Sequence, residues 1–175
     1  MIYRILIFIL FAGFITVTCT QEDARNNNPV LLHTNSVDID YGTDICSFAK
    51  KPIKTVRYGG KITLENGDIH KFMSVECTAG FYLEMDDKTT IKSIEIVDFA
   101  HGQKYLPVDE LVFLQSKLRP SPNGLFLTAI DHSNTKMKQY IYDAYPGTFM
   151  SWTEVTELVQ EEWNLSGTRA HATSF

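Results

Sequence analysis

The chain has 175 residues, of which 44% are hydrophobic, 12% aromatic and 21% charged. These values are typical of a globular protein and exclude a collagen-like, repeat-array or disordered chain. The formal net charge is −5 and no local run of Lys or Arg offsets it, which argues against nucleic acid as a partner. Three cysteines are too few for a disulfide-dense scaffold.

Residues 1–18 are typical of a secretory signal peptide rather than of the fold. They contain one charged side chain, Arg4, followed by an apolar run from Ile5 to Ile15. A run of about eleven residues is too short to span a bilayer as a helix. A cation followed by a short apolar segment is the layout of an export signal. We therefore expect the protein to leave the cytoplasm.

Cys19 stands where this signal would be cleaved, in the string ITVTCTQED. A cysteine at this place can be lipidated, and the string resembles a bacterial lipoprotein signal, with Thr16 and Thr18 where Leu and a small residue are usual. A plain signal peptide with an incidental cysteine is the alternative. Residues 19–37 then form a lipidated N-terminus and polar tether. We expect a membrane-anchored envelope protein, on the periplasmic side of the outer membrane or at the cell surface.

The first expected folded unit covers residues 38–90. Strands are expected at Tyr58–Leu64 and Ile69–Phe72, because residues 65–68, with Asn-Gly at their centre, favour a hairpin turn. A helix follows, with Ser74 near its start. Its apolar stripe consists of Phe72, Val75, Ala79 and Tyr82.

The second expected unit covers residues 91–165, ahead of a C-terminal tail at 166–175. Short strands are expected at Ile91–Asp98, Leu111–Gln115, Leu125–Ile130 and Met137–Tyr142. Ser151 followed by Glu154 forms a capping box that begins the last helix. The buried stripe of this helix consists of Trp152, Val155, Val159 and Trp163. The expected class is α+β, built from two related small units of antiparallel strands plus a helix.

Two cysteines remain in the exported chain, Cys46 and Cys77. In such a chain a disulfide is the first interpretation and a metal site the second. Met73 and Cys77 are four residues apart, so a helix through both would stack their side chains on a face away from the apolar stripe. Cys46 from a loop, and His70 from the preceding strand, would extend this set. Soft sulfur ligands select Cu(I), whereas ordinary core packing of Cys and Met is the alternative.

Enzymatic signatures are missing from the sequence. It contains no GxSxG elbow, no HExxH, no P-loop and no GxGxxG between a strand and a helix. We therefore expect a binding protein rather than an enzyme.

Five strings resemble the nitrous oxide reductase accessory lipoprotein family, NosL. They are DICSFAKKPI, RYGGKITLENGDIHKFMSVEC, YLPVDELVFLQS, SPNGLFLTAI and MSWTEVTELV, in the family order from Asp44 to Val159. The resemblance implies an exported, membrane-anchored metallochaperone with two related units of strands and a helix. It also implies that Cu(I) is bound and delivered to a copper enzyme or copper-transport partner.

The chain departs from the family pattern at several ligand-like positions. Cys46 stands at the first motif cysteine, but Ala49 and Lys51 replace the second cysteine and the methionine. Asn123 stands where the later motif has a methionine. Two hypotheses remain open. Either partly exposed Cys46 and Cys77, with Met73 and His70, form a variant Cu(I) site, or copper binding is lost and the domain is a protein-interaction module with its two thiols paired or buried.

Overall fold

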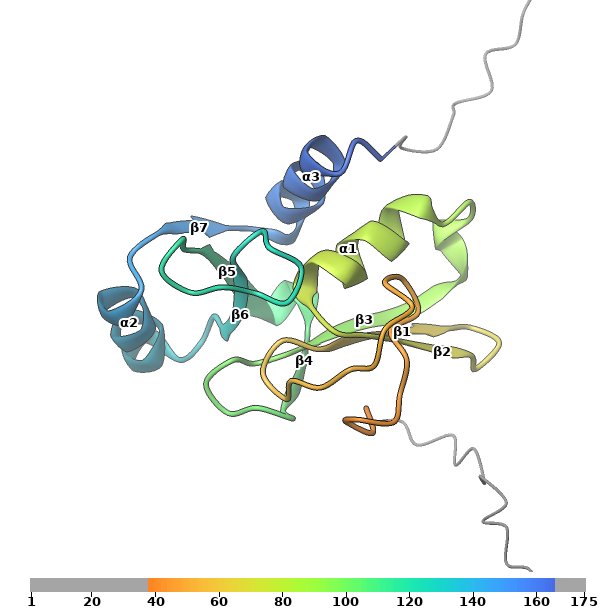
Figure 1. The fold of residues 1–175 in the computed structure, drawn as a ribbon, viewed down its shortest axis with the longest axis horizontal. Helices are drawn as coiled ribbons and strands as arrows, with labels where there is room; N and C mark the ends of the chain where they lie inside the picture. Colours follow the sequence, from red (N-terminus) through yellow and green to blue (C-terminus); the bar gives the residue numbers. More distant parts are fainter. Residues whose placement is uncertain (1–37, 166–175) are drawn as a thin grey trace, which may run out of the picture. The chain divides into compact units, whose positions relative to one another are not determined.

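The computed structural model describes residues 38–165. The expected signal peptide (1–18), the tether with Cys19 (19–37) and the tail (166–175) lie outside the described residues. Within residues 38–165, no helix is both long enough and apolar enough to cross a membrane. The domain is α+β, with two antiparallel sheets and three α-helices in the described part of the chain (Figure 1).

The first sheet has four strands in the order β2-β1-β3-β4. The strands are β1 (Gly60–Leu64), β2 (Ile69–Phe72), β3 (Ile91–Val97) and β4 (Tyr105–Pro107). The predicted hairpin joins β1 to β2, and Gly67 takes a φ of +92° that a side chain would disfavour. The turn closes through a hydrogen bond from the Gly67 amide to the Leu64 carbonyl, 2.9 Å long.

The second sheet has three strands in the order β6-β5-β7. They are β5 (Leu111–Gln115), β6 (Leu127–Asp131) and β7 (Thr148–Met150). Two short 3₁₀ helices, η1 (Lys88–Thr90) and η2 (Val108–Glu110), precede β3 and β5. The expected boundary between residues 90 and 91 falls inside the first sheet, because β3 pairs with β1. The chain passes from one sheet to the other at η2 instead.

Both predicted helices form, each with a side-chain cap. In α1 (Val75–Glu84) the Ser74 hydroxyl accepts a hydrogen bond from the Cys77 amide. In α3 (Trp152–Glu162) Ser151 and Glu154 form the predicted capping box. These side chains satisfy amide donors that the first turn of a helix leaves without partners. The local sequence therefore fixes where each helix begins.

The strand predicted at Met137–Tyr142 is wrong, because this segment belongs to helix α2 (Thr135–Ala144). Asn134 caps the helix by accepting a hydrogen bond from the Met137 amide. Ile141, one turn after Met137, is the buried residue of this helix. The aromatic and β-branched residues Tyr140, Ile141 and Tyr142 favour a strand locally, but the Asn134 cap and the burial of Ile141 select the helix.

Helix α1 is buried on two sides, which explains why six consecutive residues, 75–80, are inaccessible. Val75 and Ala79 belong to a core cluster with Val155 and Val159 of α3. Cys77 faces a second cluster that includes Phe72. Figure 1 shows α1 lying between α3 and the first sheet. Cys77 lies on a face different from the Val75 and Ala79 stripe, as expected, but this face is also core, because the first sheet and its N-terminal loop cover it.

We predict that Phe113→Ala lowers the free energy of unfolding by about 3–5 kcal/mol, because Phe113 is a fully buried residue of β5 and its removal leaves a cavity. Phe149→Ala is the matched control, since Phe149 is 38% exposed; its expected cost is below about 1 kcal/mol. Urea denaturation followed by circular dichroism measures both. Equal losses in the two variants would contradict this assignment of the core.

Candidate metal-binding thiol site

Cys46 is held in a loop that packs against β2. An isolated bridge pairs Ile45 with Pro52, and the Cys46 amide donates to the Lys51 carbonyl at 2.8 Å. The next amide, of Ser47, donates to the Lys71 carbonyl of β2, also at 2.8 Å. These bonds fix the loop to the sheet edge and turn the Cys46 side chain inward, where it is fully buried.

Cys77 lies in the first turn of α1 and is also fully buried. Its thiol forms a hydrogen bond with Cys46, and both cysteines are free, with no disulfide between them. The structure therefore brings together the two cysteines that the sequence separates by thirty positions or so. The expectation that both thiols would be partly exposed is wrong, because the loop, α1 and β2 enclose them.

The surroundings of the two thiols shift their pKa values in opposite directions. The hydrogen bond from Cys77 lowers the pKa of Cys46 to about 6, and backbone amides of Ala49, Met73 and Phe48 act in the same direction, although burial opposes them. The Ala49 amide lies 3.4 Å from Cys46 Sγ. The hydrogen bond with Cys46 and then burial raise the pKa of Cys77 well above its usual value. At neutral pH the pair is a Cys46 thiolate beside a Cys77 thiol.

Asn123 lies directly over Cys77. Its Oδ1 accepts a hydrogen bond from the Ser74 hydroxyl at 2.8 Å and faces Cys77 Sγ at 3.2 Å. The loop between β5 and β6 thus brings an amide oxygen to the thiol pair, at the position where the sequence resemblance implied a methionine.

Met73 lies next to the pair, but not through the helical stacking that its spacing predicts. It precedes the helix, which begins at Val75 after the cap Ser74. The Met73 side chain packs against the core cluster that contains both cysteines. Its backbone amide also donates to Cys46. Met73 is therefore close to the two thiols, as predicted, but it lies before the helix and not within it.

His70 is placed elsewhere. Its ring packs against Phe81 of α1, with the ring centroids 4.6 Å apart, and burial lowers its pKa. Within residues 38–165, no three His, Cys, Asp or Glu side chains lie together as a group able to hold a metal ion. His70 is therefore not gathered with Cys46 and Cys77 in this structure.

Ala49 and Lys51, where the sequence resemblance implied two ligands, contribute backbone groups to the Cys46 loop. The Ala49 amide donates to Cys46 Sγ, and the Lys51 carbonyl accepts from the Cys46 amide. The Lys51 side chain is exposed. The ammonium group thus lies at the surface, and the loop stabilises a thiolate by its amides.

Sequence reasoning missed two polar residues of this region, Glu76 and Ser121. Glu76 is fully buried beside Cys77 in the sequence, and the Ser121 hydroxyl donates to its Oε1. Glu76 Oε2 has no hydrogen-bond partner among the described residues. No pattern signals this pair, because an isolated Glu in a helix is usually solvated.

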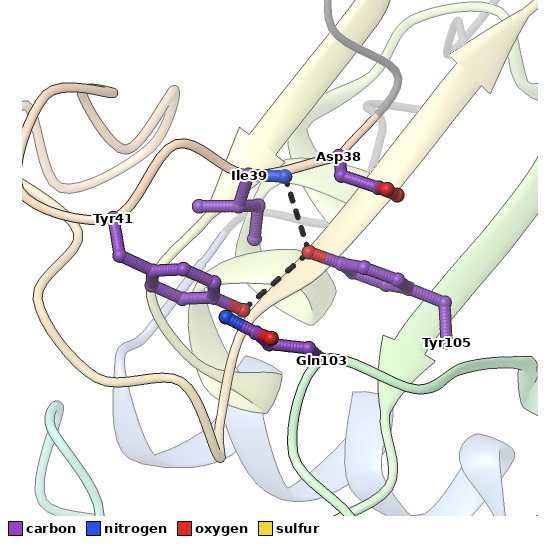
Figure 2. A pocket seen from close by; sticks show the side chains of 5 residues that line it. All are labelled: Asp38, Ile39, Tyr41, Gln103 and Tyr105. Atoms are coloured by element: carbon purple, nitrogen blue, oxygen red, sulfur yellow. Dashed lines mark hydrogen bonds between the residues drawn. The ribbon is translucent and has the colours of Figure 1, made fainter.

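A separate pocket of about 190 Å³ lies at the start of the described chain. It is lined by Asp38, Ile39, Tyr41, Gln103 and Tyr105. Figure 2 shows the Tyr105 hydroxyl between the Ile39 amide, 3.2 Å away, and the Tyr41 hydroxyl, 3.4 Å away. Burial raises the pKa of both tyrosines, so their hydroxyls are neutral. Ile39, Tyr41 and Tyr105 pack in the same core cluster as Cys46 and Cys77, but no sulfur atom lines the pocket.

Comparison with protein-family models and with curated proteins finds no match. Among solved structures, the crystal structure of the copper chaperone NosL from Shewanella denitrificans matches with a TM-score of 0.56. The match covers 66% of this chain and 92% of the NosL chain, at 14% sequence identity. The described residues of this chain therefore adopt a NosL-like fold, as the sequence resemblance implied.

Proposed function

We propose that this protein is a lipid-anchored protein of the cell envelope that binds Cu(I) and passes it to a copper enzyme or copper-transport partner. The observation that supports copper binding most directly is the contact between Cys46 and Cys77, two free thiols in one enclosed site. The NosL-like fold supports the same assignment. The protein acts by binding and transfer, not by catalysing a reaction.

The ligand chemistry of the pair favours Cu(I) over other metals. Thiolates are soft ligands, which Cu(I) prefers, whereas a structural zinc site normally needs four nitrogen or sulfur ligands. Cys46 is already a thiolate at neutral pH, so one ligand needs no deprotonation. Cys77 supplies the second sulfur after losing its proton. Met73, packed against the same cluster, is the third candidate ligand.

A site with few ligands suits transfer. A thiolate or thioether of the partner adds to the bound ion, and the ligands of this chain leave one at a time, so free Cu(I) is never released. Cys46 lies in a loop and Cys77 in a helix, so one ligand can move while the other stays fixed. We propose that the Cys46 loop, which bears the solvent-exposed Ile45, is the side that meets the partner.

We predict that the reduced chain binds one Cu(I) in competition with a chromogenic chelator. Cys46→Ser and Cys77→Ser should each weaken the Cu(I) affinity by more than about 100-fold, because each removes a ligand. Loss of a residue that only hydrogen-bonds to a ligand typically costs about 10–100-fold. Met73→Leu should weaken it less, and Met137→Leu is the matched control, since Met137 packs in a different core cluster. These assays use the Cys19→Ser background, so that Cys19 adds no thiol.

Absence of competition by the reduced wild type would contradict copper binding and favour the protein-interaction module. A thiol titration of the unfolded, non-reduced chain then separates the two remaining states of that module. Two titratable thiols indicate buried cysteines, and none indicates a disulfide. The contact between Cys46 and Cys77 is compatible with two buried thiols and with a disulfide between them.

Copper affinity should depend on pH with a defined slope. Cys46, with its pKa lowered to about 6, is deprotonated above that pH, whereas Cys77, with its pKa raised, still carries a proton that the metal must displace. Between pH 7 and 9 we therefore predict that the logarithm of the affinity rises by about one per pH unit. Competition titrations at several pH values measure this slope. A slope near zero in the wild type would show that Cys77 is not a ligand, and Cys77→Ser provides that reference.

The membrane anchor is proposed from the sequence around Cys19, which lies outside the described residues. We propose that Cys19 becomes the lipidated N-terminus and that residues 20–37 tether the domain. On that basis the protein should partition into the detergent phase of whole-cell extracts, and Cys19→Ser should move it to the aqueous phase. Immunoblots of both phases measure this. Equal partitioning of the two proteins would contradict the anchor while leaving the copper proposal intact.

A further inference from the structure

The loop 120–124 covers the thiol pair and is fastened to the first turn of α1 at two points. Near its start, Ser121 donates to the buried Glu76. Near its end, Asn123 accepts from Ser74 and faces Cys77. Ser74, Glu76 and Cys77 are within three residues of one another, so one helix end holds the whole loop.

The start of the loop, at Ser121, is held by more hydrogen bonds and is more deeply buried than the part at Asn123. Ser121 is 8% exposed and Glu76 is fully buried. The Ser121 hydroxyl also accepts from the Phe126 amide at 2.8 Å. Just before the loop, Arg119 donates to the Tyr58 hydroxyl, which in turn donates to the Pro120 carbonyl at 3.1 Å. Because the loop start is bonded on three sides, it can act as a fixed point.

The hydrogen bonds of Asn123 lie nearer to the protein surface than those of Ser121. Asn123 is partly exposed between the exposed residues Pro122 and Gly124, whereas the sulfurs below it are fully buried. Its side-chain oxygen is bonded to the site itself, through Ser74 and Cys77. Asn123 therefore stands between solvent and the thiols.

We propose that Asn123 is a gate over Cys46 and Cys77, held closed by its hydrogen bonds with Ser74 and Cys77, with Ser121 and Glu76 as the fixed point. The gate controls access for any reagent of suitable size. Its consequence for Cu(I) rests on the proposed function. The test uses no copper, so failure of the gate and failure of copper binding are distinguishable.

The experiment measures the rate at which a chromogenic aromatic disulfide reacts with Cys46 and Cys77 in the full chain carrying Cys19→Ser. In this reaction a cysteine thiolate attacks the reagent, forms a mixed disulfide and expels an aromatic thiolate. Rates are measured in the native range of urea concentrations. A rate set by local opening of the gate is independent of urea there, whereas a rate set by global unfolding rises with urea.

For Asn123→Ala we expect a urea-independent rate about tenfold above that of the wild type, which corresponds to about 1.4 kcal/mol of lost closing free energy. Asn66→Ala is the matched control, because Asn66 is an exposed turn residue of the β1–β2 hairpin whose side chain bonds to its neighbour Asp68. Its rate should equal that of the wild type. Equal rates in all three proteins, or rates that follow global unfolding throughout, would overturn the proposal.

Discussion

Burial of helix α1 on two sides is the constraint on which the rest of the domain depends. One side carries Val75 and Ala79 into the core shared with α3, and the other carries Cys77 into the core beneath the first sheet. Burial of both sides stabilises the fold through apolar area removed from water. The same packing leaves polar side chains of the first turn, Ser74 and Glu76, enclosed and in need of partners. The loop 120–124 supplies those partners.

The thiol site follows from how these enclosed groups are satisfied. The Ala49 amide of the Cys46 loop donates to Cys46 Sγ, and an amide N–H stabilises a thiolate through a hydrogen bond. Asn123 bonds to the Cys77 thiol and to the helix cap Ser74. The site therefore surrounds its two sulfurs with hydrogen-bond donors and acceptors, which makes it closed and proton-dependent.

Local signals predicted the parts of the fold that depend on neighbouring residues. The Asn-Gly turn, the Ser151–Glu154 capping box and the strand Leu111–Gln115 form as expected, because each depends on a few consecutive side chains. The segment 137–142 was predicted wrongly, since its Tyr-Ile-Tyr sequence favours a strand, and only the Asn134 cap and the packing of Ile141 select the helix. The apolar stripe of α1 predicted only one buried face. The second buried face, which carries Cys77, depends on packing against the first sheet and so could not be predicted from the helix sequence.

The sequence by itself determined the class of the fold, the helix starts, the likeness to NosL and the choice of Cys46 and Cys77 as the residues of interest. Only the tertiary structure decided that these thiols touch, that both are buried, and that His70 lies against Phe81 instead. It also brought Asn123 and Ser121 onto the first turn of α1. The physical reason is that these contacts join residues tens of positions apart, and long-range packing, unlike capping or turn formation, leaves no periodic trace in the chain.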